Sequence, residues 1–227
     1  MSMPADPGAV PVITVDGPTA SGKGAVAQAV AKRLGWRYLD SGALYRLAAL
    51  QATRLAVSLE DEPALARIAA CLPVEFSGDQ ILLDGEDVSR AIREPAIGNA
   101  ASRIAVYPSV RTALLGRQQA FRQAPGLVAD GRDMASVVFA DAPLKVFLTA
   151  AVATRAQRRH KQLIEKGFSA KLTDLQIDLE RRDARDENRA VAPLKPLKES
   201  VVIDSSLMDL ESVIASVVKL AGEKFGL

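Results

Sequence analysis

A glycine-rich loop follows a short apolar run near the start of the chain. Residues 12–25 read VITVDGPTASGKGA, and the spacing Gly17-x4-Gly22-Lys23 matches a P-loop. The backbone N–H groups of such a loop surround phosphate oxygens, and its lysine reaches the outer phosphates. The apolar run before the loop and the helix-favouring run after it supply the strand–loop–helix context that the motif requires. The pattern therefore predicts a loop that binds nucleotide phosphate.

Polar residues directly follow a second apolar run, at residues 36–39. Asp40 and Ser41 come first, and either side chain can cap the helix expected after them. Arg46 lies about one helical turn further on, where a guanidinium group can reach an anion beyond the edge of a sheet. Helix capping alone would also explain Asp40 and Ser41, so both interpretations stay open at this point.

A third apolar run ends in a charged turn. The stretch LVADGRDM, residues 127–134, places Asp130, Arg132 and Asp133 directly after an expected strand. Charged groups on a tight turn are costly to desolvate unless a partner binds them. The stretch therefore indicates either a solvated turn or a ligand-binding edge, and the P-loop favours the second.

Arginines recur at helical spacing in two late segments. The first places three of them at i, i+3 and i+4: Arg155, Arg158 and Arg159. The second, ERRDARDENR, places four charged residues on one face: Arg182, Arg185, Asp186 and Arg189. Like charges at this spacing repel one another, whereas pairs with Asp183 and Asp186 would stabilise the helix. Solvated faces and phosphate-binding faces both fit the pattern, and the P-loop favours phosphate recognition.

Apolar runs and helical patterns alternate along the chain. Strands are expected at residues 12–15, 36–39, 127–129, 146–148 and 201–203, and helices at 23–34, 43–54, 63–72, 110–123, 151–166, 172–189 and 210–224. This alternation predicts an α/β fold with a parallel sheet covered on both faces. Ligands of such sheets gather beyond the carboxyl ends of the strands, where the P-loop, Asp40 and Asp130 fall.

One stretch interrupts the alternation. The residues VEFSGDQILLDGEDV, at 74–88, predict an antiparallel hairpin with Gly-Asp at its bend, and residues 95–106 resemble a helix. We therefore expect an inserted lobe at residues 60–106, between core segments at 1–59 and 107–227.

The composition excludes several classes of protein. The 227 residues are 48% hydrophobic, enough for a full core, and a net charge of +2 gives no reason to expect nucleic-acid or membrane binding. One cysteine, Cys71, and one histidine cannot build a disulfide or a Cys- or His-based metal site, and we expect Cys71 in the core. Neither a signal-peptide pattern nor a membrane-spanning apolar run is found. A soluble, cytoplasmic, monomeric protein without a metal site of its own is expected.

From about residue 12 to residue 203, the chain resembles bacterial cytidylate kinases, within the P-loop nucleoside monophosphate kinases. The resemblance is carried by GPTASGKG, LDSGALYR, LDGEDVSRAIREPAIGNAAS, VRTALLGRQQAF, ADGRDMASVVFADAPLKVFL, RRHKQLIEKGFS and RRDARDENRAVAPL. DSGALYR, DGRDM and RDENRAVAPL are the stretches most specific to this family. The resemblance implies a P-loop kinase core with a five-stranded parallel sheet, an inserted NMP-binding lobe and a short lid at about residues 155–170.

The resemblance also implies an activity, the transfer of the γ-phosphoryl group of ATP, with Mg²⁺, to the 5′-phosphate of CMP or dCMP. It assigns ATP binding to the P-loop and the lid: Gly17, Pro18, Thr19, Ala20, Ser21, Gly22, Lys23, Gly24, Ala25, Arg155, Arg158 and Arg159. It assigns CMP binding to Ser41, Arg46, Ser102, Arg111, Arg132, Asp133, Asp186 and Arg189. The catalytic set that it implies is Lys23, Arg132, Arg182, Asp186 and Arg189.

Within the acceptor set, the resemblance divides the work by chemical group. Phosphate contacts fall to Arg46 and Arg132, and sugar contacts to Ser41 and Asp186. The cytosine edge would be read by three residues: Ser102, Arg111 and Asp133.

One position departs from the family pattern. Ala25 stands two residues after the P-loop lysine, where the family usually has Thr or Ser. The missing hydroxyl would normally stand near Mg²⁺ or a donor phosphate, so we expect weaker metal or ATP binding. Asp40 and Asp130 are the nearest carboxylates that would hold the metal through water.

Two other functions fit a P-loop. A P-loop kinase for another small acceptor, such as shikimate or a different nucleotide, leaves ADGRDM and RDENRAVAPL unexplained. A nucleotide-binding switch would require a guanine-reading NKxD element, which the sequence lacks.

Overall fold

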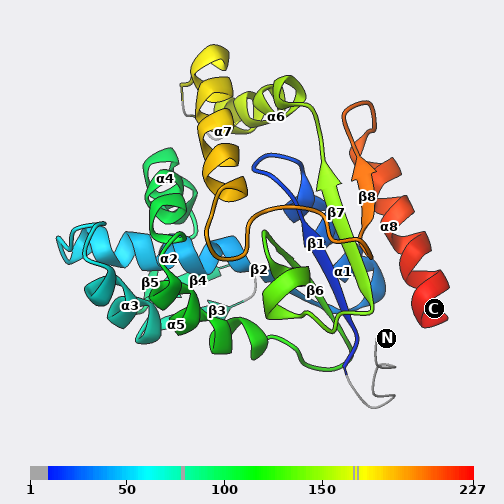
Figure 1. Cartoon of the computed structure of the whole chain (residues 1–227), viewed down its shortest axis with the longest axis horizontal. Coiled ribbons are helices and arrows are strands. Elements are labelled where there is room, and N and C mark those ends of the chain that lie inside the picture. The colour runs from blue at the N-terminus through cyan, green and yellow to red at the C-terminus, as the bar shows by residue number, and fades with distance from the viewer. Residues whose placement is uncertain (1–9, 78–79, 166, 168) are drawn as a thin grey trace. The chain divides into compact units, whose positions relative to one another are not determined.

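The computed structural model describes residues 10–77, 80–165, 167 and 169–227, and the chain divides into two compact units (Figure 1). The first unit combines the chain up to Leu39 with Phe121–Leu227, and the second is Asp40–Ala120. The expected inserted lobe, residues 60–106, falls within the second unit, which extends beyond it at both ends. The assignment of that lobe to nucleotide binding stays a prediction, as does the lid.

A five-stranded parallel sheet organises the first unit (Figure 1). Its strands, in the spatial order β2-β6-β1-β7-β8, are β2 (Arg37–Asp40), β6 (Leu127–Gly131), β1 (Val12–Asp16), β7 (Leu144–Thr149) and β8 (Val201–Asp204). β1 pairs in parallel with β6 and β7, and β7 pairs in parallel with β8. The α/β class and the five-stranded parallel sheet expected from the sequence are therefore confirmed.

The register of the sheet brings the carboxyl ends of β1 and β6 together. Val15 pairs with Asp130, and Asp16 pairs with Gly131. The loop after β1 and the turn after β6 therefore leave the sheet side by side, at the edge where ligands of parallel sheets bind.

Two helices cover one face of this sheet. α1 (Lys23–Leu34) and α8 (Leu210–Phe225) pack against each other, α1 also packs on β1 and β6, and α8 on β7. Val26, Val30 and Val217 from these helices join a buried apolar cluster with the strands. Each such side chain contributes about 1.5–3 kcal/mol when fully buried. The P-loop thus connects two elements, β1 and α1, that the core holds in place.

Three further helices belong to the first unit. α6 (Val152–Glu165) and α7 (Leu172–Glu187) pack against each other, and the short π-helix η2 (Met134–Val138) packs against β1 and β6. The sequence did not predict η2, because five residues are too few to show a helical pattern. No helix in the described part of the chain is long and apolar enough to cross a membrane.

The second unit combines helices with a small sheet. Its helices are α2 (Ser41–Arg54), α3 (Glu62–Ala70), η1 (Ala91–Arg93), α4 (Pro95–Ile104) and α5 (Pro108–Gln119). Its antiparallel strands are β3 (Val74–Ser77), β4 (Gln80–Leu83) and β5 (Glu86–Asp87). The expected antiparallel hairpin is confirmed, and its bend at 78–79 lies outside the described residues. The third strand was not expected, because two residues show no alternation.

Some boundaries differ from the expected ones for local reasons. α2 begins at Ser41, because the Asp40 side chain caps it by accepting a hydrogen bond from a first-turn backbone N–H. α5 begins at Pro108, whose fixed φ suits the first turn of a helix. α7 ends at Glu187, two residues earlier than expected. The expectation that Cys71 lies in the core is wrong, since it is exposed at the C-terminal cap of α3.

Candidate active site

Gly17 begins the P-loop and has no room for a side chain. A Cβ at this position would lie 2.0 Å from the carbonyl oxygen of Leu148 in β7. Gly22, the N-terminal cap of α1, has φ 92° and ψ 0°, a left-handed conformation that glycine adopts at little cost. The backbone geometry of the loop therefore requires glycine at both positions.

Ala20 also adopts a left-handed conformation, with φ 62°. For a residue with a Cβ this conformation costs about 1–2 kcal/mol. The hydroxyl of the neighbouring Ser21 is buried and has no hydrogen-bond partner among the described residues. Ala20 is thus held in a conformation that it disfavours, and strain of this kind is typical of ligand-binding turns.

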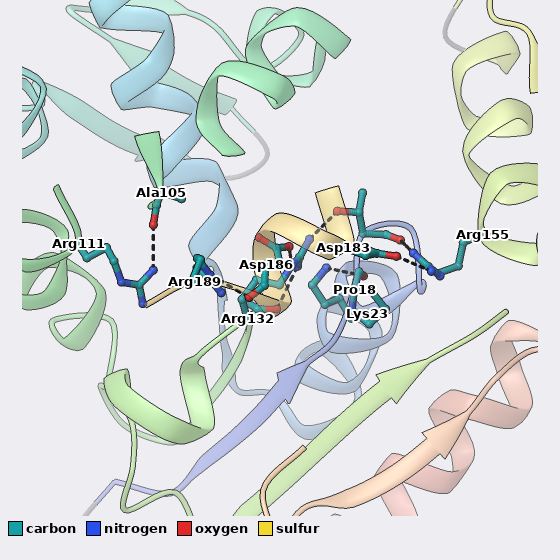
Figure 2. Close-up of polar contacts among 11 residues, drawn as sticks. Pro18, Lys23, Ala105, Arg111, Arg132, Arg155, Asp183, Asp186 and Arg189 are labelled. Carbon is teal, nitrogen blue, oxygen red and sulfur yellow. Dashed lines mark hydrogen bonds and ion pairs between the residues drawn. The ribbon is translucent and has the colours of Figure 1, made fainter. Parts of the chain in front are cut away.

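Lys23 folds back over the P-loop (Figure 2). Its Nζ donates to the Pro18 carbonyl oxygen at 3.4 Å, which is long for a hydrogen bond. Lys23 is also the first residue of α1, and first-turn N–H groups have no acceptor within their own helix. An ammonium group beside a helix N-terminus favours an anion.

Arg132, just beyond β6, connects α7 to the P-loop through a single guanidinium group (Figure 2). Its Nε donates to Oδ2 of Asp186 at 2.8 Å, and its Nη2 donates to Oγ1 of Thr19 at 2.8 Å. The third nitrogen, Nη1, donates to the Gly131 carbonyl oxygen at 3.1 Å. A planar fork held in this way suits an anion with several oxygens.

Three arginines act on the carboxylate of Asp186, which is buried on α7. Burial would raise the pKa of Asp186, but the charges of Arg132, Arg189 and Arg182, together with the hydrogen bond from Arg132, hold it below its ordinary value. Arg182 and Arg189 are themselves 8% exposed. The site therefore keeps an ionised carboxylate among buried guanidinium groups, an environment that stabilises negative charge.

Arg155 of α6 is buried between α7 and the P-loop. Its Nη2 pairs with Oδ2 of Asp183 at 2.6 Å, and its Nη1 donates to the carbonyl oxygen of Thr19 at 3.1 Å. The sequence allowed Asp183 and Asp186 to pair within α7. Asp183 pairs with Arg155 of α6, and Asp186 accepts from Arg132 while the charges of Arg182 and Arg189 also act on it, so both aspartates connect α7 to other elements.

Arg158, one turn further along α6, also contacts the P-loop. It donates to the carbonyl oxygen of Ser21 at 3.1 Å and to that of Ser205, beyond β8, at 2.6 Å. For Arg155 and Arg158 the solvated interpretation is therefore wrong, because both hold backbone carbonyls of the loop. Arg159 donates to Gln162 of its own helix instead.

Removing the carboxylate partner of a buried guanidinium group is expected to reduce stability. Asp183→Ala leaves the charge of Arg155 buried and uncompensated, so the free energy of unfolding should fall by about 3–5 kcal/mol in urea titrations. Glu165→Ala is the control. It removes the exposed partner of Lys161 on α6, the helix that carries Arg155, and it should change the free energy of unfolding little. Equal unfolding midpoints for the two variants would contradict the prediction.

Asp16, the last residue of β1, belongs to the site although the sequence analysis did not include it. Its carboxylate accepts hydrogen bonds from the backbone N–H groups of Met134 and Ala135. Burial raises the pKa of Asp16 to about 6 against the lowering effect of these bonds, and the Asp133 charge raises it further while the Arg132 charge lowers it. The available signal was a charged residue at the end of a strand made of valine, isoleucine and threonine.

In the second unit, α2 carries two residues expected to bind the acceptor. Ser41 is its buried first residue. Arg46 donates from Nη1 to the Ile92 carbonyl oxygen at 3.1 Å. The same guanidinium group lies against α4, since a Cβ on Gly98 would come within 2.9 Å of Nη1.

Two residues of this unit are expected to contact the base, and both involve α4. One lies on this helix, and the other contacts its C-terminal end. Ser102 lies on α4 and is half-buried. Arg111 of α5 is 8% exposed and donates to the Ala105 carbonyl oxygen, at the C-terminal cap of α4, at 3.3 Å (Figure 2). The second unit therefore gathers both arginines and Ser102 around one helix.

The two carboxylates suggested for Mg²⁺ differ in their surroundings. Asp40 uses both oxygens, because Oδ1 caps α2 and Oδ2 pairs with Arg93 at 3.3 Å. Asp130 is buried at the end of the sheet nearest the P-loop helix: its Oδ1 accepts from the Tyr38 hydroxyl at 3.1 Å, and its Oδ2 would lie 3.4 Å from a Cβ on Gly24, in the first turn of α1. No group of three His, Cys, Asp or Glu side chains in the described residues could hold a metal alone. Phosphate and water oxygens would therefore complete the coordination.

The first unit thus brings together expected site residues from four separate segments. These are the P-loop at residues 17–25, the turn after β6 with Arg132, α6 with Arg155 and Arg158, and α7 with Arg182 and Asp186. Ala25, where the family usually has a hydroxyl, is exposed in the first turn of α1.

Comparisons with known proteins point to one family. The family model described as Cytidylate kinase matches residues 13–223. A cytidylate kinase of Bordetella bronchiseptica is 59% identical over 96% of this chain and 98% of the relative. Cytidylate kinases of Cupriavidus pinatubonensis and Aeromonas salmonicida are 57% and 51% identical, over 92% and 97% of this chain and 95% and 97% of theirs. A solved gluconokinase structure from Sinorhizobium meliloti 1021 has a TM-score of 0.47 at 17% identity over 96% of this chain and 94% of that one, which supports no conclusion.

Proposed function

The chain belongs to the cytidylate kinase family, and from this membership we propose that it transfers the γ-phosphoryl group of ATP to the 5′-phosphate of CMP or dCMP. An oxygen of the acceptor phosphate bonds to the γ-phosphorus, the bond between that phosphorus and the β–γ bridging oxygen breaks, and ADP leaves with CDP or dCDP as the second product. The observation that carries the proposal is the P-loop joined through Arg132 to Asp186, whose carboxylate Arg182 and Arg189 also act on.

This chemistry requires positioning and charge neutralisation rather than acid–base help. The attacking oxygen is already anionic, so no general base is needed. Two phosphorylated substrates repel each other, and guanidinium groups in a poorly solvated site offset that repulsion. Their bidentate geometry also fixes the line of attack, which is how oriented reactants gain rate.

On the donor side, the P-loop holds the phosphates of ATP. Its backbone N–H groups and Lys23 contact the phosphate oxygens, as in other P-loops. Arg155 and Arg158 hold the loop in place by donating hydrogen bonds to the carbonyl oxygens of Thr19 and Ser21 respectively. Arg159 completes the arginine face of α6 toward ATP.

On the acceptor side, the first unit supplies Arg132 for the phosphate, with Arg182 and Arg189 beside the transferring group. Asp186 orients Arg132 through the 2.8 Å hydrogen bond and contacts the sugar. The carboxylate of Asp133 reads the cytosine edge. The second unit contributes Arg46 to the phosphate and further contacts to sugar and base through Ser41, Ser102 and Arg111.

Mg²⁺ accompanies ATP in this proposal, with Asp130 as the residue that holds it through water. When bound, the ion neutralises phosphate charge. Asp130 suits this role because its buried carboxylate lies beside the first turn of α1.

The proposal is tested by a coupled assay of ADP release with CMP, dCMP, UMP, AMP or no acceptor. We expect turnover that requires CMP or dCMP together with Mg²⁺. Turnover without an acceptor would instead support a nucleotide-hydrolysing switch, and turnover with another acceptor alone would support a different small-molecule kinase. The proposal includes a monomeric cytoplasmic enzyme, and light scattering of the purified protein tests the monomer.

Replacing Asp133 is expected to alter base choice more than ATP binding. In Asp133→Ala the cytosine amino group loses a charged acceptor, so the ratio of kcat/KM for CMP to that for UMP should fall by about 10–100-fold. The KM for ATP should change much less. Asp141→Ala, which removes the exposed partner of Arg122, is the control. An unchanged ratio in Asp133→Ala would refute its role as a cytosine reader.

A further inference from the structure

A residue of the neighbouring strand holds the backbone of the turn after β6. Asp16, at the end of β1, is 5% exposed, and each of its carboxylate oxygens accepts one backbone N–H. Oδ1 accepts from Met134 at 3.0 Å, and Oδ2 accepts from Ala135 at 2.8 Å. These N–H groups directly follow Arg132 and Asp133, and no step of the proposed reaction uses Asp16 itself.

The two N–H groups belong to the first turn of η2, for which Asp133 is the N-terminal cap residue. The side chain of a cap residue commonly accepts such N–H groups, yet the Asp133 side chain makes no capping hydrogen bond. Asp16 provides these acceptors from β1 instead. The Asp133 carboxylate is therefore not committed to capping η2.

The two hydrogen bonds from Met134 and Ala135 to Asp16, which we call the Asp16 clamp, connect neighbouring strands of the sheet. Asp16 pairs in register with Gly131, the residue before Arg132. Its carboxylate bonds beyond the two site residues, so the turn is held by the sheet before Arg132 and by Asp16 after Asp133. A backbone hydrogen bond also connects this turn to η2, because the N–H of Val137 donates to the Asp133 carbonyl oxygen at 2.9 Å.

We infer that Asp16 is a positioning residue for the reaction: it fixes the backbone that carries Arg132 and Asp133, and so aims the phosphate-binding guanidinium group and the base-reading carboxylate. The inference rests on the roles proposed for those two residues. A buried carboxylate is a costly way to fill space, and burial raises the pKa of Asp16 to about 6. Two hydrogen bonds to one turn account for its place there.

The test compares Asp16→Asn with Thr14→Val. Asparagine keeps the size of the side chain, but its Nδ2 is a donor facing a backbone N–H, so one of the two bonds is lost. Thr14 lies two residues earlier on the same strand, fully buried, and its hydroxyl has no hydrogen-bond partner among the described residues. Thr14→Val therefore changes a buried polar group of β1 without touching the turn.

We expect Asp16→Asn to reduce kcat/KM for CMP by about 10²-fold, the size of effect that a small misplacement of reacting groups produces. The ratio of kcat/KM for CMP to that for UMP should also fall, by about tenfold, because the Asp133 carboxylate is no longer held in position to contact the base. The affinity for an ATP analogue should stay within about threefold, because Arg155 and Arg158 also hold the P-loop, through the carbonyl oxygens of Thr19 and Ser21. Thr14→Val should match the wild-type chain in all three measurements.

Three results would overturn the inference. Asp16→Asn with wild-type kinetics would show that the bonds do not matter, and an equal loss toward CMP and UMP would show a merely structural role. If Asp16→Asn does not fold, amide hydrogen exchange of the wild-type chain decides. Protected Met134 and Ala135 amides support the clamp, whereas exchange at the rate of an unprotected loop overturns it. A wild-type chain without CMP turnover would refute the proposed function instead, and the assay of that chain alone shows this.

Discussion

Lys23→Ala is expected to lower kcat by about 10²–10³-fold or more, the loss that follows removal of one charged or hydrogen-bonding group from a transition-state site. Lys23 begins α1, and its Nζ reaches back over the P-loop to the Pro18 carbonyl oxygen at 3.4 Å. A bond of that length is weak, and the ammonium group lies beside the loop that is expected to hold phosphate.

The fold should survive this change, because the core on this side is built by Val26, Val30 and their neighbours rather than by the lysine stem. Unfolding midpoints and steady-state kinetics of the variant measure both parts of the prediction. Lys32→Ala, at the exposed C-terminal end of the same helix, is the matched control and should behave as wild type. Near-normal turnover by Lys23→Ala would show that the P-loop assignment is wrong.

Arg132→Ala should have an effect of similar size, because it removes a charged group that holds the acceptor phosphate in line, and the loss of one such group from a transition-state site costs about 10²–10³ in rate. Its guanidinium group donates to both the Thr19 hydroxyl and the Asp186 carboxylate. Removing it takes away a phosphate-binding fork and also loosens the P-loop from α7. We expect kcat to fall more than the affinity for an ATP analogue, measured by titration.

The same variant should change how Asp186 titrates. In the wild-type chain the pKa of Asp186 is held below its ordinary value, so its contribution to stability is present above the ordinary pKa and is lost as the pH falls through the lowered one. Without Arg132 the pKa of Asp186 rises, and part of that contribution is lost at a higher pH. Urea unfolding at a series of acidic pH values measures the shift.

Arg122→Ala is the control for Arg132→Ala. Arg122 also pairs with an aspartate, Asp141, at 2.6 Å, but it donates to the Val10 carbonyl oxygen, at the opposite end of β1 from the P-loop. Removing it deletes an arginine–aspartate pair of the same unit without touching the site. If both variants lost activity equally, the loss would reflect general destabilisation rather than phosphate binding.

The features that could be predicted from the sequence are those set by adjacent residues. The P-loop is one continuous stretch, and α1 begins and ends where the pattern predicts, at Lys23 and Leu34. The alternation of strands and helices predicted the five-stranded parallel sheet, because a strand buried on both faces must be apolar along its length. The sequence also predicted that the P-loop, Asp40 and Asp130 lie at the carboxyl ends of β1, β2 and β6, which is the edge where ligands of parallel sheets bind.

Other features depend on which residues meet in space. Arg155 on α6 was allowed to be solvated, and Asp183 was allowed to pair within α7, since helical spacing cannot distinguish a neighbour on the same helix from one on another. Packing of α6 against α7 joined them instead. The left-handed conformation of Ala20 could not be predicted from the sequence either, because the surrounding structure imposes the strain in a loop.

Sequence alone specified the chemistry available to this chain: a phosphate-binding loop, a parallel sheet to present it, and the arginines that phosphates require. Folding specified their partners. Thr19 and Arg132 are separated by 113 positions in the chain yet share a hydrogen bond, because β1 and β6 lie next to each other in the sheet. The same adjacency brings Asp16 to the backbone of Met134 and Ala135. Strand order follows from the packing of the whole chain, and no local pattern of residues encodes it.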